Sequence, residues 1–175
     1  MIKIIKIIAW TFGLASTLIM TIIGIGYFIQ YLGDPEQLSD KDLYFNKERY
    51  NTALETIKLL LPMTSGYVLA VAPIVKYLKD EKLLWSKEII FGIILTFAFG
   101  ILSIGLWSGV LAFLVDAAHG FDENIKNYQQ LNFIWNQVGV FSSLAHLSFF
   151  TSVSWFITTS ILTLIESWKL KEIKN

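Results

Sequence analysis

The chain has 175 residues, enough for one domain, and its formal net charge at pH 7 is zero. Hydrophobic residues make up 54% of it and charged residues 16%, whereas soluble domains carry about 25% charged residues. With a mean hydropathy of +0.56, a soluble fold would expose a large apolar surface, so an ordinary soluble domain is excluded. The zero net charge gives no reason to expect nucleic-acid binding. The absence of cysteine excludes disulfides, cysteine-ligated metals and thiol catalysis.

Four long apolar stretches follow one another along the chain. The expected spans are about 4–32, 58–77, 88–115 and 133–166. A helix of about 20 residues crosses the hydrocarbon core of a bilayer, and a membrane segment must satisfy its own backbone hydrogen bonds. The sequence therefore predicts an all-α fold, an integral membrane four-helix (tetraspan) bundle with residues 1–175 as a single domain.

The first stretch has an alternative interpretation as a secretory signal peptide, because Lys3 and Lys6 precede an apolar run. The run is about 25 residues long, against about 7–15 for the core of a signal peptide. No clear small-x-small cleavage site follows it. We therefore expect a span that is retained.

Basic residues are divided unequally between the two ends of the predicted spans. Nine lie in the two tails and in or beside the inner loop 78–87, and five lie in or beside the outer loops 33–57 and 116–132. The positive-inside rule places the more basic side in the cytoplasm. We expect both termini there, with the chain crossing the cell (inner) membrane several times.

The outer loop 33–57 is expected to be partly helical. Asp34 can cap a helix that has Pro35 at its first position. A turn near Asn46 would then lead into a helix that continues into the second span. The other outer loop, 116–132, is polar and is expected to form a loop or a short helix.

The fourth stretch holds the main candidate for an intramembrane polar site. Residues 141–160 include nine Ser or Thr residues and His146, and ionisable residues at such depth are functional candidates. Ser142 lies one turn before His146, and Asp116 is the only acid within plausible reach. We favour a neutral histidine that is hydrogen-bonded within the bundle, and a proton-sensing role is the alternative.

Catalysis and cofactors are not expected. A Ser–His pair needs a third group to orient the histidine, and the charge-free parts of the third and fourth spans, 89–115 and 133–165, hold no carboxylate. Haem ligation by two histidines would require His119 at the depth of His146, but His119 lies in an outer loop. The sequence therefore predicts no catalytic residue, no metal site and no cofactor.

The hydroxyl groups of the fourth span fall on several sides of a helical wheel. A helix that lines a pore should have one polar stripe. Ser and Thr can instead donate a hydrogen bond to the carbonyl one turn earlier, and the free-energy cost of placing them in lipid is then small. A helix packed at the centre of the bundle is the better interpretation. A water-filled path through an assembly of several copies is the alternative.

Small residues mark candidate helix contacts. Gly105 and Gly109 form a GxxxG motif, and Gly66 and Ala70 form a weaker version of it. Such strips allow close helix approach, either in a homo-oligomer or within one bundle. A further pattern, FGxxxT, occurs at 12–17 and at 91–96 and reflects either an internal duplication or coincidence.

Four lysines define a candidate surface on the inner side, which we call the lysine surface: Lys76, Lys79, Lys82 and Lys87. This surface could bind anionic lipid or a cytoplasmic protein partner. It could also be a solvated turn that merely obeys the positive-inside rule.

These features favour a non-enzymatic membrane protein, an oligomeric anchor or sensor subunit that engages a cytoplasmic partner. The alternative is a small homo-oligomeric pore, channel or transporter subunit in which the fourth span and His146 line the path. The basic residues are 13 Lys and one Arg, a coding bias that suggests a bacterial source and a setting such as stress response or antiviral defence.

Overall fold

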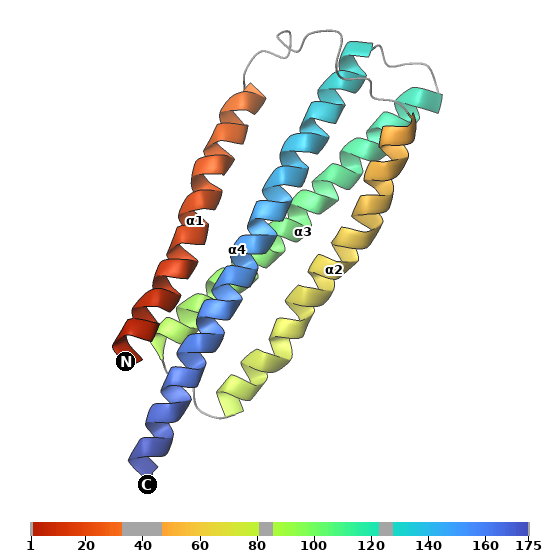
Figure 1. Ribbon diagram of the computed structural model, residues 1–175. Helices are drawn as coiled ribbons and strands as arrows, with labels where there is room; N and C mark the ends of the chain where they lie inside the picture. Colours follow the sequence, from red (N-terminus) through yellow and green to blue (C-terminus); the bar gives the residue numbers. More distant parts are fainter. Residues whose placement is uncertain (1, 33–46, 81–85, 123–127, 175) are drawn as a thin grey trace.

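The computed structural model describes residues 2–32, 47–80, 86–122 and 128–174, and of these only Ser86 lies outside a helix. The four helices are α1 (Ile2–Leu32), α2 (Lys47–Asp80), α3 (Lys87–Asp122) and α4 (Tyr128–Lys174). They form an elongated bundle (Figure 1). We call the end where α1 begins and α4 ends the terminal end. The predicted all-α four-helix fold is confirmed.

Each helix contains a segment long and apolar enough to cross a bilayer. These segments are Ile2–Tyr27, Tyr50–Asp80, Lys87–Ala118 and Phe133–Lys169. Large apolar side chains are exposed on the outside of all four helices, among them Ile7, Leu69, Ile101 and Phe150. Such a surface is tolerated next to lipid tails but not in water. The chain is therefore a multi-pass membrane protein.

The helices extend beyond the apolar runs on which the spans were placed. α2 begins at Lys47, inside the expected outer loop 33–57, and it includes the helix expected to lead into the second span. α3 and α4 both continue into the region 116–132. Hydropathy marks the part of a helix that crosses lipid, but the helix itself continues as long as its backbone bonds do. The short helix expected before Asn46 lies outside the described residues.

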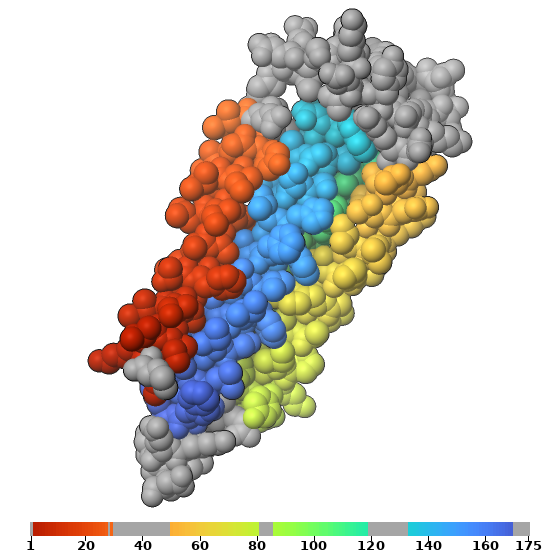
Figure 2. Space-filling model, viewed as in Figure 1, coloured from red at the N-terminus to blue at the C-terminus, as the bar shows by residue number. Residues whose placement is uncertain are grey.

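α4 is the central helix of the bundle. It packs against α3 and α1, while α2 packs mainly against α3. Half of the 18-residue apolar window that marks α4 as a span is buried, compared with 11% of the corresponding window of α1. Figure 2 shows α4 filling the space between α1 and α2 on one face of the molecule. The polar residues of α4 therefore face other helices to a greater extent than those of any other span.

Two apolar clusters hold the two ends of the bundle together. The larger lies away from the terminal end and includes Ile57, Trp107, Leu114 and Ile134, from α2, α3 and α4. The smaller, near the terminal end, comprises Leu78, Ile89 and Leu162. Between them lies the hydroxyl-rich middle of α4, which is where the candidate site was expected.

Candidate functional site

The buried hydroxyl groups of α4 bind main-chain carbonyls of their own helix. Ser148, Thr151 and Thr159 each donate to the carbonyl one turn earlier, at 2.7–2.8 Å. All three side chains are buried. Because each hydroxyl is satisfied within the helix, it adds little cost in a lipid environment. The bonding matches the packing interpretation of these residues.

Ser152 joins three helices. Its Oγ donates to the carbonyl of Thr96 in α3 at 2.6 Å. A hydroxyl has a single hydrogen, so the 3.3 Å contact between Ser152 Oγ and the hydroxyl of Tyr67 in α2 is a bond that Tyr67 donates. The Tyr67 ring also packs edge-on against Phe149 and Phe156. This group is a polar link between α2 and α4.

The two copies of the FGxxxT pattern both contact α4. A Cβ added to Gly13 of α1 would lie 3.1 Å from the Trp155 ring and from Thr158 Oγ1. A Cβ added to Gly92 of α3 would collide with the side chain of Thr159. The glycines therefore allow α1 and α3 to approach two neighbouring residues of α4 closely.

The threonines of the two patterns take part in the same contacts. Trp155 Nε1 donates to Thr17 Oγ1 at 2.8 Å, and the Thr17 hydroxyl donates to the Gly13 carbonyl at 3.0 Å. In the second copy the carbonyl of Thr96 accepts the bond from Ser152. Helix packing therefore accounts for both copies of the pattern, with or without an ancestral duplication.

His146 is held by two neighbours within the bundle. Its Nδ1 lies 2.9 Å from the carbonyl oxygen of Ser142, and because a carbonyl can only accept, Nδ1 carries the hydrogen. The imidazole also meets the indole of Trp107 edge to face, with 4.8 Å between ring centroids. Trp107 is 2% exposed. Ser142 therefore contacts the histidine through its backbone oxygen.

Asp116 is placed at a different level of the bundle from His146. Trp107 marks the level of His146 on α3, and Asp116 lies nine residues further along the helix, which corresponds to about 13 Å. The Asp116 side chain is exposed. The structure thus brings His146 and Ser142 together but not Asp116. Within the described residues no group of three or more His, Cys, Asp and Glu is placed to hold a metal ion.

No protein-family model, no curated protein and no solved structure matches the chain. Its function therefore has to be argued from its own residues.

The candidate glycine strips are only partly covered by this chain. The position of a Cβ on Gly109 lies 3.1 Å from the Phe141 ring of α4, so this glycine packs within the bundle. Gly105 and Gly66 have nothing within 4 Å of that position, and Ala70 is exposed. The three uncovered positions form part of the outer surface, where lipid or another protein can reach them.

The candidate lysine surface lies at the terminal end. Lys76 and Lys79 are exposed on the last turns of α2, and Lys87 is exposed at the start of α3. Within the described chain the ion pairs engage other lysines and none of these three. Lys82 lies outside the described residues.

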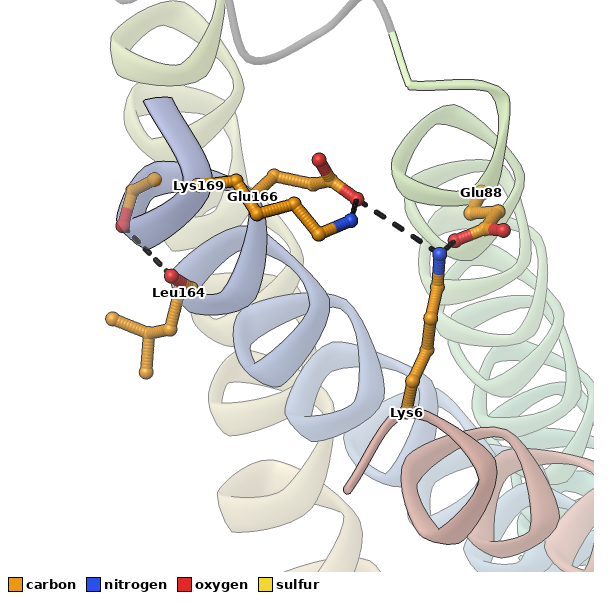
Figure 3. A network of polar contacts seen from close by, with 6 residues as sticks. Lys6, Glu88, Leu164, Glu166 and Lys169 are labelled. Carbon is orange, nitrogen blue, oxygen red and sulfur yellow. Dashed lines mark hydrogen bonds and ion pairs between the residues drawn. The ribbon is translucent and has the colours of Figure 1, made fainter. Parts of the chain in front are cut away.

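A charged cluster at the terminal end was not anticipated from the sequence. Lys6 of α1 forms ion pairs with Glu88 of α3 and with Glu166 of α4, the second at 3.8 Å. Glu166 also binds Lys169 at 3.1 Å. Figure 3 shows Lys6 reaching between the two carboxylates. The sequence showed Lys6 as a charged residue at the edge of an apolar run. It could not predict the partners of Lys6, because Glu88 and Glu166 are far away in sequence.

Gln137 is a second residue that the sequence did not single out. Its side chain is 1% exposed, and neither its amide nitrogen nor its amide oxygen has a hydrogen-bond partner in the described structure. An unpaired buried amide is costly. It is the least satisfied polar group of α4.

Proposed function

We propose that this chain is a non-enzymatic membrane anchor or sensor subunit of a bacterial inner membrane. Its terminal end faces the cytoplasm and engages an acidic cytoplasmic protein through the lysine surface. The chain acts as a homo-oligomer. The observation that carries the proposal is the contrast between the buried hydroxyl groups of α4, which form hydrogen bonds inside the bundle, and the exposed lysines, which form no ion pair within the described residues.

The bonding of α4 supports a structural role for its polar residues. Ser152 and Thr158 bind the main chains of α3 and α1, and the ring of His146 lies against Trp107. A conduction path needs polar groups that face a continuous aqueous space. Side chains that are bound to neighbouring helices leave few groups for that purpose.

The lysine surface supports the contact with a partner. Three exposed cations lie near one another in sequence, at the end of α2 and the start of α3, and none is neutralised by an ion pair in the described chain. A surface with an excess of one sign attracts an oppositely charged partner and steers its approach. The positive-inside rule assigns this end to the cytoplasm.

The uncovered small residues support self-association. Gly66 of α2 and Gly105 of α3 each leave an open patch of helix surface, with no atom of the described residues within 4 Å of a Cβ added there. Close packing of small residues is a common basis of helix association in membranes. An anchor that assembles from several copies would also multiply the weak charge contacts of each lysine surface.

The proposal is tested by charge reversal on α2. The protein is isolated from its native membrane in mild detergent, and the cytoplasmic proteins retained with it are identified and quantified. Lys76→Glu and Lys79→Glu should each reduce the retained acidic partner several-fold, and raised salt should have the same effect.

Lys58→Glu is the matched control, because Lys58 is exposed on the same helix at the opposite end. It changes the net charge equally and should leave the partner bound. Equal losses for all three variants, or no loss for any of them, would refute the role of the lysine surface.

The pore alternative makes a separate prediction. If His146 lines a path, proteoliposomes containing the wild-type chain should conduct ions, and His146→Ala should change that flux. The packing of His146 against Trp107 favours no flux in either case.

A further inference from the structure

A groove lies between α1 and α3 at the terminal end. It has a volume of about 430 Å³ and is lined by Lys3, Lys6, Ile7, Trp10, Thr11, Leu14 and Glu88. Its position is separate from the lysine surface, whose residues do not line it. We propose that this groove binds an anionic phospholipid whose head group lacks an amine, as in phosphatidylglycerol.

The groove has a charged end and an apolar end, as a phospholipid has. Its charged residues lie near the start of α1 and of α3, and Leu14 lies eleven residues after Lys3, about 16 Å further along the helix. The intervening lining residues include the apolar side chains of Ile7 and Trp10. A head group therefore meets charge at the rim while an acyl chain meets apolar surface deeper in the membrane.

Trp10 supplies a rigid wall to the groove. Its indole stacks on Phe91 at 5.9 Å between ring centroids and meets Trp155 edge to face at 5.5 Å. Tryptophan is enriched at the interface between head groups and hydrocarbon. The wall is held by α3 and α4, so the groove exists before any lipid binds.

The charges at the rim favour an anion. The pair of Lys6 and Lys169 is balanced by Glu88 and Glu166. Lys3 is exposed and takes part in no ion pair within the described residues, so one positive charge remains. The first turn of α1 contains no acidic residue, and its free N–H groups add a partial positive charge.

The same charges disfavour a zwitterionic head group. Its ammonium would need a carboxylate at the rim, and the carboxylate that lines the groove, Glu88, is already paired with Lys6. The ammonium would also lie near the cation of Lys3. A head group with one phosphate and no amine carries one negative charge, which balances the one uncompensated positive charge of Lys3.

The test compares two lipids with identical acyl chains on the purified, delipidated full chain. Lipid binding is measured by native mass spectrometry with phosphatidylglycerol and with phosphatidylethanolamine. Wild-type protein should bind phosphatidylglycerol more tightly. Lys3→Gln should weaken this binding about fivefold, the effect of one lysine near anionic lipid, and Lys3→Arg should retain it.

Two further variants separate the groove from general surface charge. Lys76→Gln removes an exposed lysine at the same end but outside the groove, and it should leave binding unchanged. Thr11→Trp fills the groove from an exposed position whose hydroxyl bonds only within α1, and it should weaken binding without unfolding the protein. Equal binding of the two lipids, or equal loss from Lys76→Gln and Lys3→Gln, would overturn the proposal.

Discussion

The indole Nε1 of Trp155 donates a hydrogen bond to Thr17 Oγ1 at 2.8 Å and thereby joins α4 to α1. Trp155 is fully buried, and the same Thr17 hydroxyl donates to the Gly13 carbonyl. The bond thus uses both the donor and the acceptor capacity of the threonine. It lies on the seam where α1, otherwise the least buried span, is attached to the bundle.

A double-mutant cycle should detect this bond. Thr17→Val leaves the Trp155 N–H without its acceptor, and Trp155→Phe removes the donor. Each should lower the free energy of unfolding, and the coupling between them should be about 0.6–1.7 kcal/mol, the range for polar contacts between membrane helices. Unfolding in a denaturing detergent measures both values. Strict additivity of the two changes would mean that the bond does not stabilise the protein.

Glycine-to-alanine substitutions should differ according to what each glycine faces. A Cβ at Gly100 would lie 2.6 Å from Val68 Cγ2 and 3.3 Å from Ser152 Oγ, so Gly100→Ala should cost about 1–3 kcal/mol through overpacking. Gly105→Ala meets open space and should leave the stability of the monomer unchanged or slightly higher. Mass photometry of Gly105→Ala should show a smaller oligomer if Gly105 lies in the subunit interface. Equal destabilisation by both substitutions would contradict the packing described for Gly100.

Gln137→Leu should stabilise the protein. The leucine has a similar size and removes two buried polar atoms that lack hydrogen-bond partners, each of which costs about 1–3 kcal/mol. The contrasting variant is Ser152→Ala, which removes a satisfied donor to Thr96 and should be destabilising. A lower melting temperature for Gln137→Leu would show that the amide makes a contact the bundle needs.

Lys6→Met should loosen the terminal end. Lys6 lies between Glu88 and Glu166, and without it two carboxylates face each other with less compensation. We expect a loss of roughly 1 kcal/mol, and Lys6→Arg should restore most of it. Lys169→Met should lower the free energy of unfolding by less, because Lys169 pairs with Glu166 and not with Glu88. A larger loss of stability from Lys169→Met than from Lys6→Met would contradict the central position given to Lys6.

The spans could be predicted from the sequence because a charge-free run of membrane length has few alternatives. The surroundings of His146 could not, because Trp107 lies on another helix and their contact depends on the register of α3 against α4. The link from Lys6 to Glu166 likewise requires distant helix ends to meet.

The glycine motifs show the same limit. A GxxxG pattern predicts a flat strip but not what covers it, and here Phe141 covers Gly109 while Gly105 stays open. The glycines that collide most closely with other helices when a Cβ is added are Gly92 and Gly100, which are eight residues apart and form no such motif. Only the packed structure reveals which glycines contact a neighbouring helix.

The central claim is that the terminal end, with its exposed lysines, faces the cytoplasm. The chain has no cysteine, so single-cysteine variants can be labelled without background. Lys79→Cys and Asn51→Cys place exposed thiols near opposite ends of α2. A membrane-impermeant maleimide added to intact cells should label Asn51→Cys at once and Lys79→Cys only after the membrane is opened. Labelling of Lys79→Cys in intact cells would contradict the account.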